Sequence, residues 1–433
     1  MTNQLSIAPR FTVLPKGDAS HLDLLVRLQA ESAPVDTNRP TLNLCLCIDR
    51  SGSMQGDPLE NAKAAAIHLV RQLRTGDQIS VVSYGQDVRL VAEPMDAMQG
   101  RDYVIRQIQA IRSMGGTPLR AGWLEAAKAL APFQSKFGIS RVLLLSDGQA
   151  TDGSTPAGLA AEAAELRAAG ITTSTYGLGS NFNEALMTQL GQQGGGVAFY
   201  AATASELIPY FESEFAMLSA TVGRSVNARL EARIVGRVKG KDKALVVERL
   251  DTLTPLGDHP VALPALVAGA ESWVALRVQL PKMGGKYSLD LTSVVEWESM
   301  DGQKQSLTAN ELLSVGDHAV ETTDTVVIER LKEVEAARLQ REVLKQAEQG
   351  NWGVAKSMLR GMSASAGSNA YIAKVAASLQ GIAESGNLNS LSKEVAYSAY
   401  AMTNRVADVG EDTTVLNADR FNLRKASQSR SSK

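Results

Sequence analysis

A repeated order of short apolar segments followed by helix-like segments constrains the fold of this chain most, and it runs from residue 41 to residue 220. Residues 42–48 (LNLCLCI) and 141–145 (RVLLL) are nearly continuous apolar runs, which are typical of strands buried on both faces. Repeated strand–helix order is typical of a mostly parallel sheet with helices on both faces. We therefore predict a doubly wound α/β domain here.

Apolar spacing locates the individual elements of this domain. It predicts helices at residues 58–73, 101–111, 119–130, 156–169, 184–191 and 204–218. It predicts the other strands at residues 78–84, 88–92, 171–178 and 197–200. Gly85-Gln86 marks a hairpin turn, and Gly170 stands where a helix C-cap is expected.

Polar side chains follow the two buried strands directly. Asp49, Ser51 and Ser53 come after the first strand, and Asp147 comes after the second. In such sheets ligands bind beyond the carboxyl ends of the strands, where the strand order reverses. Carboxylate and hydroxyl oxygens, with a further hydroxyl from Thr117, suit a hard cation such as Mg²⁺. We therefore predict a cation site at this edge of the sheet.

The segments IDRSGSM, GGTPL and LLLSDGQ resemble the von Willebrand factor A (VWA) domain with a complete metal-ion-dependent adhesion site (MIDAS). Further similar segments are GDQISVVSYG, GLGSNFNEALM and GGGVAFY. The resemblance covers about residues 41–220 and implies that Asp49, Ser51, Ser53, Thr117 and Asp147 bind the metal, with the two aspartates acting partly through water. It implies Mg²⁺, with Mn²⁺ or Ca²⁺ as alternatives, and an open position for a partner's Asp or Glu.

Two further regions are expected outside this domain. Period-two patterns at residues 227–235, 272–280 and 287–297 predict an antiparallel β-sandwich, which the alternating segment 21–28 is expected to join. Helical patterns at residues 325–347, 352–362, 369–384 and 388–404 predict a C-terminal helical bundle. The predicted organisation is 1–38 sandwich strands, 39–220 VWA domain, 221–316 β-sandwich, 317–405 bundle and 406–433 flexible basic tail; it resembles bacterial proteins of this family.

Composition limits the classes of partner and compartment. The chain has 433 residues and a net charge of -2, which argues against bulk attraction to nucleic acid or to anionic membranes. Cys45 and Cys47 cannot build a disulfide framework or a zinc site by themselves. We find no leader-like segment at the N-terminus and no apolar stretch of membrane-spanning length, so we expect a cytoplasmic protein. The oligomeric state is not predicted.

Other polar residues near the site loops have simpler interpretations. Asp57 and Asp152 are expected to be solvated turn residues rather than partner contacts. Arg50 could face an acidic partner or be solvated, and the sequence does not decide between the two. His68 is expected to be structural. The scattered histidines and the lack of a glycine-rich phosphate loop argue against an enzyme, hydrolysis at the metal included.

Two functions of different classes follow from these patterns. The first is a scaffold protein whose Mg²⁺-loaded site binds an acidic side chain of a protein partner. The alternative is an accessory subunit of a MoxR-type ATPase, of a metal-inserting complex or of a kinase-linked stress-response complex. This alternative comes from the family resemblance alone.

Overall fold

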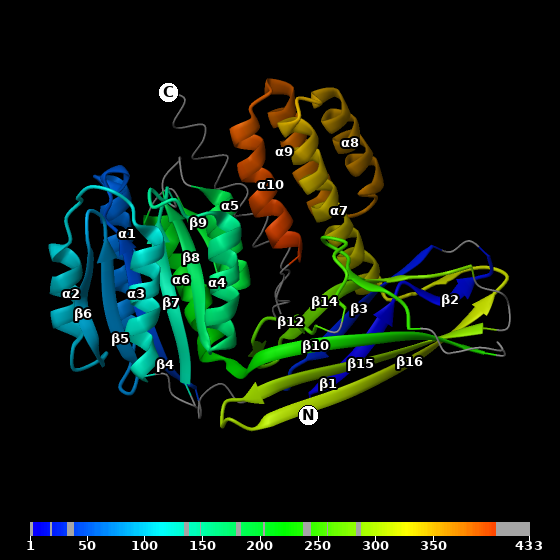
Figure 1. The fold of residues 1–433 in the computed structure, drawn as a ribbon, viewed down its shortest axis with the longest axis horizontal. Helices are drawn as coiled ribbons and strands as arrows, with labels where there is room; N and C mark the ends of the chain where they lie inside the picture. Colours follow the sequence, from blue (N-terminus) through cyan, green and yellow to red (C-terminus); the bar gives the residue numbers. More distant parts are fainter. Residues whose placement is uncertain are drawn as a thin grey trace. The chain divides into compact units, whose positions relative to one another are not determined.

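The computed structural model describes residues 3–17, 20–32, 39–133, 138–147, 149–178, 183–201, 204–236, 244–257, 259–282 and 287–403. The predicted basic tail, residues 406–433, lies outside these residues. The chain divides into two compact units (Figure 1). The α/β unit comprises Pro34–Ser225 and Glu298–Gln303, and the sandwich–bundle unit comprises Met1–Ala33, Val226–Trp297 and Lys304–Lys433.

The α/β unit contains a six-stranded sheet in the order β6-β5-β4-β7-β8-β9. Its strands are β4 (Thr41–Asp49), β5 (Gln78–Tyr84), β6 (Val88–Asp96), β7 (Gly138–Ser146), β8 (Ile171–Leu178) and β9 (Gly195–Ala201). Only β6 is antiparallel to its neighbour, and the other pairs are parallel. The predicted doubly wound fold is thus confirmed.

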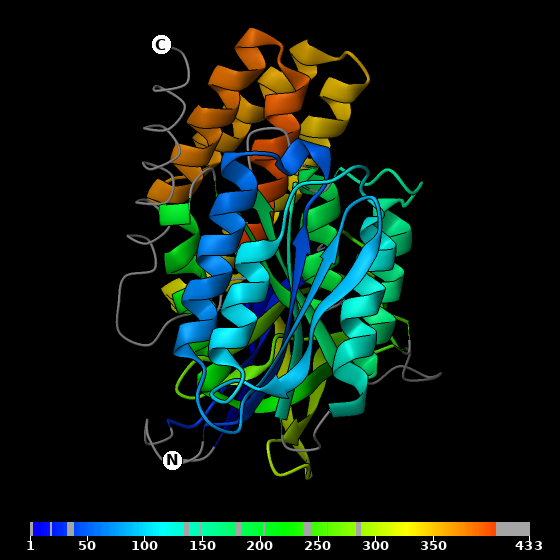
Figure 2. The same cartoon turned by 90° about the vertical axis from the view of Figure 1, so that its left-hand side faces the viewer.

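Helices cover both faces of this sheet because its central strands are apolar on both sides (Figure 2). Leu44 and Leu46 of β4 belong to the apolar core shared with helices α1, α2 and α6, whereas Cys45 and Cys47 belong to the core shared with α3, α4 and α5. The helices are α1 (Asp57–Gln72), α2 (Arg101–Ala110), α3 (Leu119–Leu130), α4 (Pro156–Ala168), α5 (Glu184–Gln193) and α6 (Ala204–Ser219). Short 3₁₀ helices are η1 (Gly52–Met54) and η2 (Ala131–Phe133).

The main departure from the predicted boundaries is in β6, which continues to Asp96 rather than ending at residue 92. The continuation includes Pro94. Proline cannot donate to the hydrogen-bond ladder, but β6 is an edge strand, where one side has no ladder to complete. Tertiary position therefore decided what the local sequence could not.

The sandwich–bundle unit has two sheets. One has the order β1-β3-β14-β11, with β1 (Gln4–Pro9), β3 (His21–Gln29), β14 (Glu271–Gln279) and β11 (Val247–Arg249). The other has the order β12-β10-β15-β16-β2-β17, with β13 beside β10. Its strands are β12 (Val261–Ala262), β10 (Thr221–Gly236), β15 (Tyr287–Ser299), β16 (Lys304–Gly316), β2 (Phe11–Pro15), β17 (Val320–Glu321) and β13 (Leu266–Val267).

Strands that are far apart in the sequence pair with each other in this unit. β3 precedes the α/β unit in the chain, yet it pairs antiparallel with β14 from His21↔Gln279 to Gln29↔Glu271. The predicted sandwich was antiparallel, but β16 and β2 pair in parallel over Ser314–Gly316. This pairing is non-local, so the alternating pattern of neither strand could indicate its direction.

Four helices complete this unit: α7 (Thr325–Glu348), α8 (Trp352–Ser365), α9 (Ala370–Ser385) and α10 (Leu388–Thr403). They share one apolar core. Asp324 caps α7 by accepting from the backbone N–H groups of Val326 and Val327. No helix in the described part of the chain is long and apolar enough to cross a membrane.

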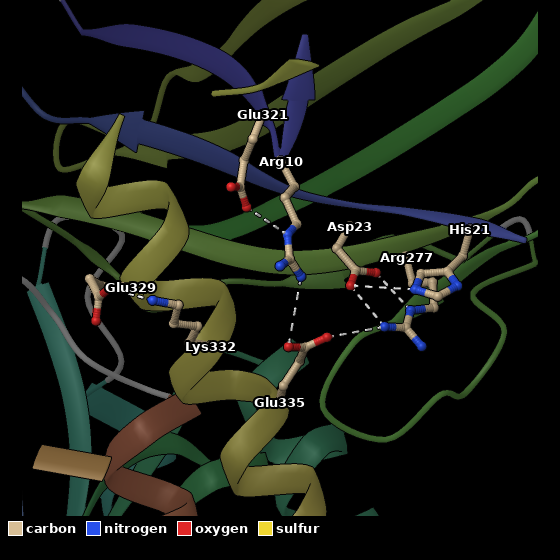
Figure 3. Close-up of polar contacts among 8 residues, drawn as sticks. All are labelled: Arg10, His21, Asp23, Arg277, Glu321, Glu329, Lys332 and Glu335. Atoms are coloured by element: carbon tan, nitrogen blue, oxygen red, sulfur yellow. Dashed lines mark hydrogen bonds and ion pairs between the residues drawn. The ribbon is translucent and has the colours of Figure 1, made fainter. Parts of the chain in front are cut away.

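Ion pairs join α7 to the sandwich (Figure 3). Arg277 on β14 donates to both carboxylate oxygens of Asp23 on β3, at 2.7 and 2.8 Å. Glu335 of α7 lies between Arg277, at 3.5 Å, and Arg10, at 4.0 Å. Asp23 is 2% exposed, so its charge depends on this arginine.

We predict that Asp23→Asn destabilises the sandwich–bundle unit by about 3 kcal/mol, because it leaves the Arg277 guanidinium without its buried partner. The measurement is the free energy of urea unfolding. Asp317→Asn is the matched control, since Asp317 pairs with Lys16 at the surface, and it should leave the unfolding midpoint unchanged. Equal effects of the two substitutions would contradict the assigned role of the buried pair.

Candidate metal centre

The order of the strands places the predicted site. β4 lies at the centre of the sheet, with β5 and β6 on one side and β7, β8 and β9 on the other. Asp49 is the last residue of β4, and Asp147 directly follows β7. β4 and β7 are parallel neighbours, so both aspartates leave the sheet at the same edge, at the point where the strand order reverses.

The first loop gathers three of the predicted ligands. Asp49 Oδ1 accepts a hydrogen bond from the backbone N–H of Ser51 at 2.8 Å. The hydroxyl oxygens of Ser51 and Ser53 are 3.1 Å apart. Asp49 and Ser51 are buried, whereas Ser53 is exposed. The carboxylate therefore forms the buried side of the site, and Ser53 lies at its open side.

The second loop carries Thr117 and is tied to the first loop. The backbone N–H of Gly52 donates to the carbonyl of Gly115 at 2.8 Å. The Ser113 hydroxyl donates to the carbonyl of Ser51 at 2.9 Å. Thr117 itself is buried. These bonds hold the second loop against the first without using the hydroxyls of the predicted ligands.

The third loop is tied to both of the others. The backbone N–H of Thr117 donates to Thr151 Oγ1 at 2.9 Å, and the N–H of Thr151 donates to the carbonyl of Thr117 at 3.0 Å. The Ser146 hydroxyl donates to Asp49 Oδ2 at 2.6 Å. Asp147 Oδ1 accepts from the N–H of Gln149 at 3.1 Å. The fold thus brings the loops of all five predicted residues together.

Sequence reasoning did not identify Ser113, Ser146 and Thr151 as part of this arrangement. Ser146 stands beside a predicted ligand in the segment LLLSDGQ, which was the available indication of its role. Thr151 and Ser113 bond to loops distant in sequence, so only the folded chain could show their contacts.

The electrostatics of the site favour a cation. Burial raises the pKa of Asp49 to about 6, and the nearby charge of Asp147 adds to the rise, while hydrogen bonds from Ser146 and Ser51 oppose it. Among the described residues, neither aspartate has an ion pair with an arginine, lysine or histidine. The described residues contain no group of three or more His, Cys, Asp or Glu side chains that could hold a metal ion, so the hydroxyls have to contribute to the donor set. Two carboxylates with hydroxyls form a donor set that fits a hard divalent cation.

The contacts of Arg50 differ from both alternatives that the sequence left open, an acidic partner and exposure to solvent. Its residue is 4% exposed, and its guanidinium pairs with the carboxylate of Asp87 after β5. It therefore neither faces a partner nor lies in solvent. The backbone of Arg50 contributes instead, since its carbonyl accepts from the N–H of Met114 at 2.7 Å.

The other residues near the site have local contacts. Asp57 is exposed in the first turn of α1. Asp152 is exposed and accepts from the backbone N–H of Arg120 at 3.0 Å. His68 on α1 lies 3.1 Å from the Glu212 carboxylate.

Comparison with known proteins matches residues 43–213 to the von Willebrand factor type A domain. The uncharacterized protein YfbK of Escherichia coli (strain K12) is 33% identical over 195 residues, which are 44% of this chain and 34% of that protein. The chain spans less than half the length of the curated relatives it matches.

Two solved structures are similar along nearly the whole chain. The ArnB paralog VWA2 from Sulfolobus acidocaldarius has a TM-score of 0.61 at 16% identity and covers 93% of this chain and 98% of its own. The von Willebrand factor type A protein from Catenulispora acidiphila has a TM-score of 0.64 at 17% identity, with coverages of 94% and 98%. These likenesses show the fold: a VWA domain with additional sheets and a C-terminal helical region.

We predict that in EDTA the protein loses stability as the pH rises through about 6. The pKa of Asp49 is raised from 3.8 to about 6 in the folded protein. The stabilisation that protonation of Asp49 gives the folded state is therefore complete below about pH 4 and is lost as the pH rises above about 6. The full effect is about 3 kcal/mol.

The measurement is the difference in unfolding free energy between the natural protein and Asp49→Asn, at pH 4.5 and pH 7.5. Asparagine has no charge to bury, so the unfolding free energy of Asp49→Asn should rise relative to that of the natural protein as the pH rises. A difference that does not vary with pH would contradict the prediction.

Proposed function

Because residues 43–213 form a von Willebrand factor type A domain, we propose that this chain is a metal-dependent scaffold protein. Its site at Asp49, Ser51, Ser53, Thr117 and Asp147 would hold Mg²⁺ and bind an Asp or Glu carboxylate of a partner protein. VWA domains typically serve as protein-interaction modules, which supports the general class. The metal and the acidic partner are the specific parts of the proposal.

One observation carries this proposal: the buried aspartates of the site lack the cation that other buried aspartates have. Asp23 pairs with Arg277, Asp77 with Arg39, and Asp251 with Arg249. Asp49 and Asp147 are 0% and 6% exposed and have no such partner in the described part of the chain. A buried unpaired carboxylate is costly, and a bound divalent cation would remove that cost.

The chain's own residues prepare this site for an ion. The Ser51 N–H and the Ser146 hydroxyl fix the two oxygens of Asp49 in one orientation. The hydroxyls of Ser51, Ser53 and Thr117 would complete the protein's share of the ligands. Bound Mg²⁺ supplies a positive charge that attracts an anionic group. Ser53 is exposed, so a partner's carboxylate would approach on its side of the site.

A binding role agrees better with these residues than a catalytic one. The three site loops contain no histidine, cysteine or lysine that could act as a base or nucleophile. Asp49 already accepts two hydrogen bonds and would serve as a ligand. We propose that the chain is not an enzyme.

We predict that Asp49→Ala abolishes Mg²⁺ binding and any partner capture that depends on Mg²⁺. Immobilised protein would be incubated with cell extract in Mg²⁺, and the proteins that EDTA releases would be identified and purified. Binding of each purified protein would then be measured before and after its acidic residues are changed to amides. We expect at least a tenfold loss for Asp49→Ala and for one acidic residue of the partner.

Asp152→Asn is the matched control, because Asp152 is an exposed aspartate in the third loop that is not among the proposed ligands. It should bind Mg²⁺ and the partner as the natural protein does. Capture that is unchanged in Asp49→Ala and in EDTA would refute the proposal.

A further inference from the structure

Tyr84 is a further residue that the fold places beside the proposed metal centre. It is the last residue of β5 and pairs in register with Asp49 on β4. Its carbonyl accepts a hydrogen bond from the N–H of Arg50 at 2.8 Å. The backbone of Tyr84 is therefore fixed to the first residues of the site loop.

The ring of Tyr84 is also fixed. The residue is 0% exposed, and its ring packs on Gly122 of α3 so closely that a Cβ there would lie 2.4 Å from the ring atom Cδ1. Only glycine leaves room for this contact, which accounts for a glycine within a helix. The position of the hydroxyl at the end of the ring is thereby set.

The hydroxyl of Tyr84 is buried but has no hydrogen-bond partner of good geometry among the described residues. Other buried aromatic groups of the α/β unit are paired. The Tyr176 hydroxyl donates to Glu214, and Trp123 Nε1 donates to Thr173 Oγ1 at 3.0 Å. A buried hydroxyl without a partner is unfavourable, and such a group commonly marks the place of a bound water or ion.

The groups that face this hydroxyl belong to the metal centre. Burial raises the pKa of Tyr84 well above its ordinary value, and the charges of Asp49 and Asp147 raise it further. A phenol hydroxyl carries its proton at neutral pH, so it can donate a hydrogen bond to an oxygen atom in these acidic surroundings. The Ser146 side chain is near enough to interact with this hydroxyl, but the two do not meet hydrogen-bond geometry, and the Ser146 hydrogen is donated to Asp49.

We propose that Tyr84 is a positioning residue of the metal centre, whose hydroxyl donates a hydrogen bond to a water ligand of the bound ion on the buried side of the site. The inference rests on the proposed metal binding and extends it. Mg²⁺ usually keeps several of its waters in proteins, and a buried water needs two to four polar partners. Tyr84 and the two carboxylates would provide them.

Tyr84→Phe tests this role because it removes the hydroxyl and keeps the ring against Gly122. We expect the Kd for Mg²⁺, measured by calorimetry, to rise about tenfold, as for other residues that orient metal ligands. In EDTA the melting temperature should stay the same or rise, since an unpaired hydroxyl has been removed. A crystal structure with Mg²⁺ should show the water between the Tyr84 hydroxyl and the ion.

Tyr176→Phe is the matched control, a buried tyrosine of the same unit that bonds to Glu214. It should lower the melting temperature in EDTA and leave the Kd for Mg²⁺ unchanged. The inference is overturned if Tyr84→Phe binds Mg²⁺ within twofold of the natural protein, or if its weaker binding accompanies an equal loss of stability in EDTA. A Mg²⁺-bound structure without this water also overturns it.

Other outcomes separate this inference from the proposed function. If the natural protein binds no Mg²⁺, both are wrong. If it binds Mg²⁺ in a manner that needs Asp49 and Tyr84, but captures no acidic partner, the positioning role stands and the proposed partner is wrong.

Discussion

The burial of two carboxylates at the end of the central parallel strands is the constraint on which the rest of the site depends. Asp49 and Asp147 leave β4 and β7 side by side, and among the described residues no basic side chain pairs with either. The low polarity of the surroundings makes a charge there costly, as the raised pKa of Asp49 shows. This cost is the reason that we propose a bound cation at the site.

The backbone holds this arrangement in place. The loops are joined through Gly52–Gly115 and Thr117–Thr151 bonds, so the oxygen ligands do not have to hold the loops themselves. Ser146 and Tyr84 occupy the buried side, where a hydroxyl can orient a carboxylate or a water without competing for the open side. In the proposed function, this separation would let the buried side hold the ion while the open side remains accessible to a partner.

Elsewhere in the chain, several buried carboxylates form ion pairs with arginines. In the sandwich–bundle unit, Asp23 has Arg277, and Glu271 has Arg27 and Arg330. In the α/β unit, Glu214 has Arg141. These pairs join elements that are far apart in sequence, and each charge has its partner inside the protein, so the loss of one partner would leave the other charge buried and uncompensated. Among the described residues, Asp49 and Asp147 have no such partner, which is why we propose a bound cation there instead of a structural ion pair.

The α/β fold could be predicted from the sequence, since short apolar runs and helical periods report burial directly. The structure places each predicted helix and strand of this domain within a few residues of its expected position. The sequence also predicted five oxygen-bearing site residues, four of which follow the ends of buried strands, with Thr117 on a separate loop. The folded chain was needed to show that Arg50 pairs with Asp87, that β6 extends through Pro94, that β16 and β2 run in parallel and that Tyr84 lies beside Asp49. The physical reason is that local periodicity records which side of an element is buried, whereas the identity of the neighbour there depends on segments distant in the chain.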